Sequence, residues 1–230
     1  VMNNGAWQDV VSSLTDAGVE IVAFGGIRPN PVMEDVDRAA LIGRNEKVDM
    51  VVAVGGGSVI DSAKMMAIAI PSGHDVWDFI TGQSKPRAAL PLLAVLTLAA
   101  TGTEMNHYAV IQNNHTKQKV GYGHPSMYPR HSFLDPGYTL SVSAYHTGCG
   151  IADLVAHSLE AWFGIGDSPL SDHFILSIIR EAMEAGTLLL NDLQNYPLRA
   201  RIMYAATCAL NGMTVPGKKS QDWGVHAIGH

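Results

Sequence analysis

The chain has 230 residues, which is enough to bury a substantial core in one large domain or two small ones. Its 15 lysines and arginines against 21 acidic residues give a net charge of −6 without any basic run, and this disfavours a nucleic-acid partner. The longest apolar stretch, residues 88–100, is shorter than the roughly 18 residues of a membrane span, and two cysteines are too few for a disulfide framework, so we expect a cytoplasmic protein without a membrane partner.

The first half of the chain alternates helical and strand-like patterns. Helices are expected at residues 6–17 and 33–46, and strands at residues 19–24, 48–54 and 91–98, with a short one in HSFLD near Asp135. The run VDMVVAV at 48–54 is continuously apolar, as is typical of strands covered on both faces of a parallel sheet. This half is therefore expected to form an α/β domain.

The second half has only helical patterns. They cover residues 146–163, 169–190 and 198–211, and begin again at residue 222. We place the boundary between an α/β domain, residues 1–142, and a helical domain, residues 143–230. The chain has no start methionine and its last helical pattern has no stop signal, so we expect a fragment of a longer protein, truncated at both ends.

A glycine-rich loop follows the strand at 48–54, in VVAVGGGSVIDSAK. Gly55, Gly56 and Gly57 let the backbone approach a ligand, and free amides at the start of the next helix attract phosphate. The pattern is neither G-x-G-x-x-G nor a Walker motif, which disfavours an ordinary phosphate-loop kinase. The simpler interpretation is that Ser58 caps the helix with Asp61 as its capping-box partner. Three consecutive glycines favour phosphate binding, and the two interpretations are compatible.

A second polar loop, LTLAATGTEMN, follows the strand at 91–98. It offers the side chains of Thr97, Thr101, Thr103 and Asn106. Ligands of open α/β sheets gather at the carboxyl ends of the strands, so this loop is expected at the same sheet edge as the glycine loop. Its alternative role is a polar turn that caps the following helix.

Two pairs of potential metal ligands share a spacing of four residues. Asp153 and His157 lie in GIADLVAHSLE, and His226 and His230 lie in DWGVHAIGH. Residues i and i+4 share one helix face, so each pair can direct two ligands to one point. One carboxylate with imidazoles suits Fe²⁺ or Zn²⁺. The alternative is two hydrogen-bonded or solvated pairs. Ala227 stands where a zinc protease has its catalytic glutamate, which disfavours a metallopeptidase.

The motifs GGGSVIDSAK, TLAATGTEMN, FLDPGYT, GIADLVAHSLE and DWGVHAIGH, in this order, resemble the iron-dependent (group III) alcohol dehydrogenases, most of all their butanol dehydrogenase and broad-specificity aldehyde reductase branch. The resemblance covers essentially the whole chain. It implies a dehydroquinate synthase-like architecture, in which a Rossmann-like N-terminal domain precedes an all-helical C-terminal domain with a divalent metal between them. It also implies a homodimer.

The resemblance assigns roles to individual residues. Asp153, His157 and His226 match three metal ligands, whereas His230 matches a histidine near the nicotinamide, which makes it the expected catalytic residue. The family's fourth metal ligand and its first strand would lie outside this chain. The family's cofactor contacts would fall on Gly56, Gly57, Ser58, Asp61, Thr97, Thr101, Asn106, Lys119 and Tyr138. Without the resemblance, we would interpret Lys119 as a surface lysine.

The resemblance implies hydride transfer between NAD(P)(H) and a primary alcohol or aldehyde. The metal, Fe²⁺ or Zn²⁺, would polarise the substrate oxygen, and His230 would pass a proton to solvent. The branch usually prefers NADP over NAD, but the segment that decides this precedes residue 1. The alternatives are a glycerol dehydrogenase-like or other polyol dehydrogenase, and, from another class, a non-catalytic nucleotide-binding module or inactive fragment.

Overall fold

The computed structural model describes residues 3–229. They form two compact units. Unit 1 contains the described residues up to Leu96 together with His107–Phe133, and unit 2 contains Thr97–Asn106 and the described residues from Leu134 onward. Within the described part of the chain, no helix is both long enough and apolar enough to cross a membrane.

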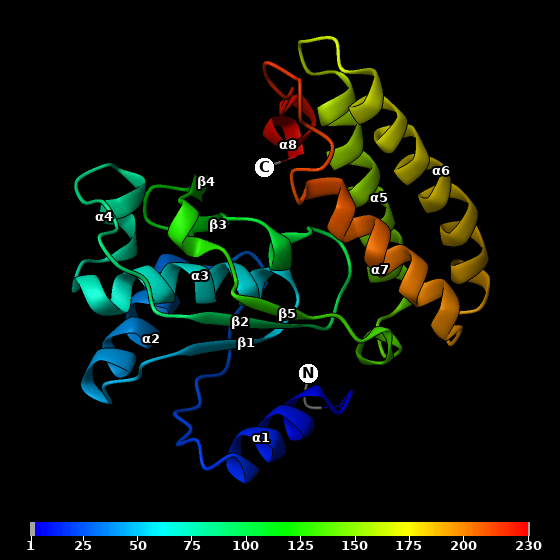
Figure 1. Ribbon diagram of the computed structural model, residues 1–230. Helices are drawn as coiled ribbons and strands as arrows, with labels where there is room; N and C mark the ends of the chain where they lie inside the picture. The colour runs from blue at the N-terminus through cyan, green and yellow to red at the C-terminus, as the bar shows by residue number, and fades with distance from the viewer. Residues whose placement is uncertain (1–2, 230) are drawn as a thin grey trace. The chain divides into compact units, whose positions relative to one another are not determined.

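Unit 1 is built on a three-stranded parallel sheet (Figure 1). Its strands are β1 (Val51–Gly55), β2 (Leu92–Leu96) and β5 (His131–Phe133), in the order β1-β2-β5. Gly55 is paired with Leu96, so β1 and β2 end at the same edge of the sheet. The glycine loop and the second polar loop therefore both begin at this edge, as expected for ligand-binding loops of an open α/β sheet.

Helix α3 (Gly57–Ser72) is the centre of unit 1, because it packs against β1 on one side and against a β-hairpin on the other (Figure 1). The hairpin consists of β3 (Tyr108–Asn113) and β4 (Gln118–Gly123). The fully buried Lys64 of α3 donates from Nζ to the carbonyl oxygen of Tyr108, at 2.7 Å. Apolar side chains from α3, the hairpin and the neighbouring helices α2 (Met33–Asn45) and α4 (Val76–Ile80) complete the core.

Unit 2 is helical. Its long helices are α5 (Ala144–Trp162), α6 (Pro169–Asn191) and α7 (Tyr196–Leu210), and a short helix α8 (Gly224–Gly229) follows. Small and branched apolar residues fill the space between the long helices, among them Leu154, Leu189 and Ile202. Short 3₁₀ turns lie at Thr103–Met105, Pro136–Thr139 and, in unit 1, Pro125–Met127. Ser143 caps α5 by accepting from the His146 N–H, and Asn195 caps α7 in the same way.

The loop Thr97–Asn106 belongs to unit 2 because it packs closely on two of its helices. Gly102 has φ +58°, and a Cβ there would lie 2.9 Å from the carbonyl oxygen of Ala206 in α7. A Cβ on Gly150 of α5 would collide with the carbonyl oxygen of Ala99. Both positions therefore require glycine because a side chain would not fit, and Gly102 also requires it for its positive φ.

The elements of the structure differ in part from those expected from the sequence. Residues 19–24 are not a strand but an irregular segment after helix α1 (Ala6–Asp16), since no described strand pairs with them. The domain boundary at residue 142 stays a prediction; unit 2 of the structure takes the described residues from Leu134 onward and the loop Thr97–Asn106, which packs on its helices. The β3–β4 hairpin and helix α4 were not expected at all.

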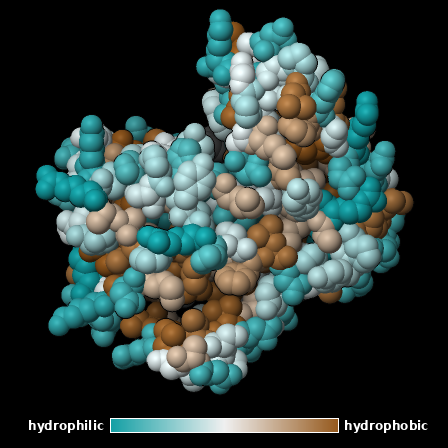
Figure 2. All heavy atoms as spheres, viewed as in Figure 1, coloured by the Kyte–Doolittle hydropathy of each residue, from teal (hydrophilic) through white to brown (hydrophobic). Residues whose placement is uncertain are grey.

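An apolar groove of about 590 Å³ lies in unit 1 beside the free edge of β1. It is lined by α1, by residues 19–24, by β1 and by α3, with side chains such as Leu14, Val22, Val52 and Ile70. Figure 2 shows apolar side chains gathered around this hollow. Residues 19–24 therefore line the groove with apolar side chains and do not pair in the sheet.

Burial of Asp37 gives unit 1 a distinct pH dependence. Asp37 Oδ1 accepts from the Val76 N–H at 2.8 Å, and burial raises the pKa of Asp37 to about 6, against the opposing effect of this hydrogen bond. The folded state thus binds the proton more tightly than the unfolded state, so stability is lost as the pH rises through about 4 to 6. Asp37→Asn keeps an acceptor for Val76 without the buried charge.

We expect Asp37→Asn to stabilise the protein by about 1–3 kcal/mol near pH 7.5, and by much less near pH 4.5. Urea unfolding at the two pH values measures this difference. Asp49→Asn, at an exposed carboxylate, is the control. Equal effects of Asp37→Asn at both pH values would contradict the assignment.

Candidate metal centre and phosphate loop

Helix α5 presents three polar side chains on one face. Asp153, His157 and Glu160 are spaced by four and three residues, so they lie along the same side of the helix. The neighbouring Leu154 is fully buried in the core of unit 2. The apolar stripe therefore fixes the rotation of α5 and with it the direction of the polar face.

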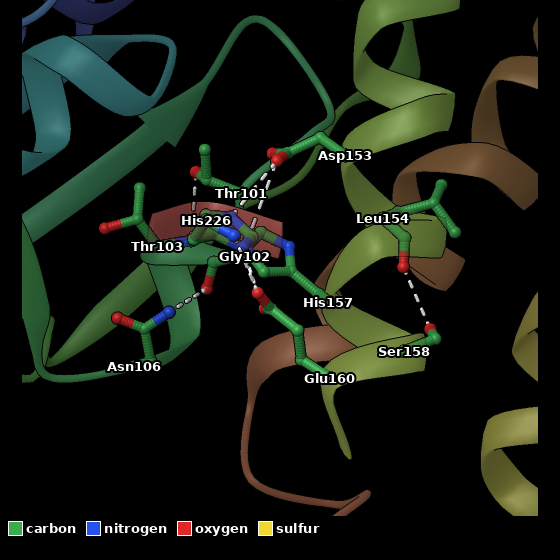
Figure 3. A network of polar contacts seen from close by, with 10 residues as sticks. All are labelled: Thr101, Gly102, Thr103, Asn106, Asp153, Leu154, His157, Ser158, Glu160 and His226. Atoms are coloured by element: carbon green, nitrogen blue, oxygen red, sulfur yellow. Dashed lines mark hydrogen bonds and ion pairs between the residues drawn. The ribbon is translucent and has the colours of Figure 1, made fainter. Parts of the chain in front are cut away.

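Helix α8 brings His226 to this face (Figure 3). Asp153 Oδ1 lies 3.6 Å from His226 Nε2 and 4.0 Å from His157 Nε2. The two imidazole rings stack, with centroids 4.6 Å apart and planes 16° from parallel. One potential ligand atom from each of the three residues lies within 4.8 Å of the others, so the structure brings all three predicted metal ligands together.

The geometry of these three donors fits a divalent metal. Ligand atoms bound at about 2.0–2.2 Å in a tetrahedral arrangement lie about 3.3–3.6 Å apart, close to the 3.6 and 4.0 Å that separate Asp153 Oδ1 from the two histidine nitrogens. One carboxylate oxygen and two imidazole nitrogens form a donor set for Fe²⁺ or Zn²⁺ rather than for Ca²⁺ or Mg²⁺.

The two histidines of the cluster differ in electrostatic environment. Burial lowers the pKa of His157, against the opposing charge of Asp153. Hydrogen bonding to Asp153, with a further contribution from Glu160, raises the pKa of His226. Burial therefore favours the neutral form of His157, which is the form that binds a metal, whereas the carboxylates favour the protonated form of His226, with which a metal ion would compete.

Glu160 is a part of this cluster that the sequence analysis missed. Its side chain is only 1% exposed, and its Oε1 lies 2.6 Å from His226 Nδ1. The signal was present in the sequence, because an acidic residue on the face of Asp153 and His157 continues the same helical spacing. His230, the expected catalytic residue, lies outside the described residues.

The start of α3 has the form of a phosphate site. Gly56 occupies the N-cap position without a side-chain cap, and the first amides of the helix have no intrahelical acceptor. Such amides and the helix dipole attract anions. A Cβ on Gly55 would lie 2.6 Å from the side chain of Val59, so a larger residue cannot be placed where β1 turns into α3.

The capping interpretation of this loop is wrong. Ser58 lies inside α3, and its Oγ accepts from the Asn30 N–H at 3.2 Å. Asp61 Oδ2 accepts from the Val110 N–H at 2.9 Å, so Asp61 fastens the hairpin to α3 instead of completing a capping box. The cofactor roles of Gly56, Gly57, Ser58 and Asp61 remain predictions.

The other expected cofactor residues are divided between the units. Lys119 lies half-buried on β4 in unit 1. In unit 2, Thr97 is buried, Thr101 Oγ1 accepts from the Thr103 N–H, and Asn106 Nδ2 donates to the Gly102 carbonyl oxygen at 3.0 Å. These contacts hold the second loop in its conformation. The helix that this loop was expected to cap is only the short 3₁₀ turn Thr103–Met105. Tyr138 is half-buried in the turn Pro136–Thr139.

Comparison with known proteins identifies the class. Residues 1–136 match the family described as iron-containing alcohol dehydrogenase, and residues 147–230 match its C-terminal part, described as Fe-containing alcohol dehydrogenase family, C-terminal. The chain belongs to the iron-containing alcohol dehydrogenase family. This confirms the resemblance and the expected combination of an α/β part with a helical part.

Individual relatives are similar over the entire chain. The sequence is 40% identical to "Probable NADH-dependent butanol dehydrogenase 1" of Bacillus subtilis and 36% identical to the NADPH-dependent aldehyde reductase YqhD of Escherichia coli, in each case over 100% of this chain. The crystal structure of NADH-dependent butanol dehydrogenase A from Thermotoga maritima superimposes with a TM-score of 0.96 at 38% identity, covering 99% of this chain and 57% of that one. The chain spans 59% of the Bacillus protein and 60% of the Escherichia protein.

Proposed function

We propose that the protein is a metal-dependent alcohol dehydrogenase or aldehyde reductase, which transfers hydride between NAD(P)(H) and a primary alcohol or aldehyde. The observation that carries the proposal is the convergence of Asp153 Oδ1, His157 Nε2 and His226 Nε2. It occurs in a chain whose relatives are named butanol dehydrogenases and an aldehyde reductase.

The three ligands would contribute differently to metal binding. Asp153 brings a negative charge, while burial lowers the pKa of His157 and so favours its neutral, metal-binding form. With one carboxylate and two imidazoles, a divalent ion retains net positive charge. When bound, such an ion supplies Lewis-acid chemistry, which favours an alkoxide or polarises a carbonyl group.

The glycine loop would hold the cofactor. The amides at the start of α3 are suited to the diphosphate of a dinucleotide, and the nicotinamide supplies the hydride chemistry. Thr97, Thr101, Asn106, Lys119 and Tyr138 remain predicted contacts to the rest of the cofactor. The named relatives include users of NADH and of NADPH, so both cofactors belong in the assay.

The alternatives receive no support from these relatives. The butanol dehydrogenases and the aldehyde reductase act, by their names, on alcohols or aldehydes rather than polyols. A non-catalytic nucleotide-binding module predicts no bound metal and no oxidation of NADH or NADPH. The proton-transfer role of His230, the homodimer and the cytoplasmic location also remain predictions.

The proposal is tested by metal analysis of the purified protein together with a butyraldehyde reduction assay with NADH and with NADPH. We expect about one Fe²⁺ or Zn²⁺ per chain and oxidation of at least one of the two cofactors. A protein with neither metal nor cofactor oxidation would contradict the proposal and favour the non-catalytic alternative.

A charge placed at the start of α3 tests the phosphate loop separately. In Ser58→Asp the new carboxylate still accepts from Asn30 and complements the helix dipole, so folding is preserved. It repels a diphosphate by about 1–4 kcal/mol, which raises the KM for NAD(P)H at least about tenfold. The metal content should not change. An unchanged KM would show that the diphosphate does not bind at this helix start.

A further inference from the structure

Glu160 is buried beside the metal-ligand cluster, although it is not one of the three predicted metal ligands. It lies one helical turn beyond His157, with only 1% of its surface exposed. A carboxylate at such depth requires hydrogen-bond donors, because an unpaired buried charge is strongly destabilising. Its donors therefore indicate what the side chain does.

Both donors to Glu160 Oε1 come from one residue. The His226 main-chain N–H lies at 3.0 Å and the His226 ring Nδ1 at 2.6 Å (Figure 3). In addition, the Asp222 N–H donates to the main-chain oxygen of Glu160 at 3.0 Å. Glu160 therefore connects the end of α5 to the start of α8, and it holds the backbone and the ring of the same histidine at once.

These contacts determine which ring nitrogen of His226 is free for a metal. Because Oε1 already accepts from the main-chain N–H, the ring contact is best satisfied with the proton on Nδ1, directed to the carboxylate. The lone pair then lies on Nε2. This is the atom 3.6 Å from Asp153 Oδ1, on the side of the ring where the other two ligands converge.

We propose that Glu160 is a positioning residue of the metal centre, which fixes the orientation and the tautomer of His226. The inference rests on the proposed function, because it requires that the cluster binds a metal. Carboxylates that accept from the second ring nitrogen of a ligating histidine orient the ring and increase its basicity, and their loss typically weakens metal binding about 10- to 100-fold. Glu160 acts through His226 and not on the substrate.

The second carboxylate oxygen supports this assignment over that of a simple helix cap. Glu160 Oε2 is buried and has no hydrogen-bond partner among the described residues. The oxygen of a neutral glutamine would also accept from the main-chain N–H, so this contact alone does not require an ionised carboxylate. The retained charge is therefore directed at the imidazole, whose basicity it increases, and not required for the cap.

The test is titration of the metal-free protein with Co²⁺, with the affinity and the visible absorption band of the bound ion as readouts. We expect Glu160→Gln to bind Co²⁺ about tenfold more weakly and Glu160→Ala about 100-fold more weakly. The band should change in position or intensity in both, because His226 is held differently. The far-ultraviolet circular dichroism spectrum of metal-free Glu160→Gln should equal that of the unaltered protein, since the amide oxygen accepts the same main-chain N–H.

Glu181→Gln is the matched control, because this carboxylate pairs with Arg201 on the surface of α6 and α7. It should leave the Co²⁺ affinity and spectrum unchanged. An affinity and spectrum of Glu160→Gln equal to those of the unaltered protein, in a preparation where His157→Ala loses Co²⁺, would overturn the role of Glu160 alone. Failure of the unaltered protein to bind Co²⁺ would overturn both this inference and the proposed metal centre.

Discussion

Replacement of His157 by alanine is expected to abolish metal binding and thereby to lower the rate of aldehyde reduction at least about 10³-fold. His157 is 4% exposed and supplies one of only three donors in the described cluster. Two remaining donors bind a divalent ion weakly in competition with water. A bound metal typically stabilises the transition state by several kcal/mol, and each 1.36 kcal/mol corresponds to about a tenfold change in rate.

Asp153→Asn separates this effect from damage to the fold. The asparagine has the same size as Asp153, which is 29% exposed, but it removes the negative charge that the three ligands bring to the metal. We expect it to lower the metal content and the rate in parallel, with an unchanged far-ultraviolet circular dichroism spectrum. His173→Ala, on the exposed side of α6, is the control and should retain both. Full metal content in His157→Ala and Asp153→Asn would show that the ligands lie elsewhere.

Replacement of Arg199 by alanine is expected to destabilise unit 2 by about 3–5 kcal/mol. Arg199 is 4% exposed, and its guanidinium donates to the carbonyl oxygens of Leu193 and Val142 and to Thr147 Oγ1, at 2.9–3.1 Å. Burial lowers the pKa of Arg199, but hydrogen bonds from a charged donor are each stronger than neutral ones. Without them, the start of α5 and the connection before α7 lose their shared anchor.

Urea unfolding of the metal-free protein measures this loss. Arg199→Lys is the informative companion, because its ammonium group retains the charge but cannot reach three acceptors in the planar geometry of a guanidinium. We expect it to recover only part of the stability. A change below about 1 kcal/mol in Arg199→Ala would show that water replaces the guanidinium, and that the three acceptors do not depend on it.

The secondary structure was predictable where local pattern and tertiary environment agree. Helices α2, α5, α6 and α7 lie within a few residues of their expected positions, because their apolar spacing corresponds to a buried face. Residues 19–24 have the composition of a strand, yet strand formation also needs a backbone partner, which composition does not reveal. The β3–β4 hairpin was missed because β4 begins with two polar residues and contains Gly121 and Gly123, so that it carries little apolar signal.

The site was predictable in part for a similar reason. Asp153 and His157 are neighbours on any helix that contains them, so their spacing alone indicates a pair. The approach of His226 depends on how α8 folds against α5, which no local pattern encodes. The spacing of the second pair made His226 a potential ligand, and only the resemblance to a family separated it from His230. Asp61 shows the converse, since its local position suggested a cap whereas the structure uses it to bind the hairpin.

The free edge of β1 has a consequence for handling the protein. One edge of this strand binds β2, and no described strand covers the other, so its peptide groups border an apolar groove. Such an edge is a template onto which another extended chain can add, and it competes with correct folding as concentration rises. Refolding of the protein therefore calls for a low protein concentration, and a check for aggregates by light scattering should precede any kinetic measurement.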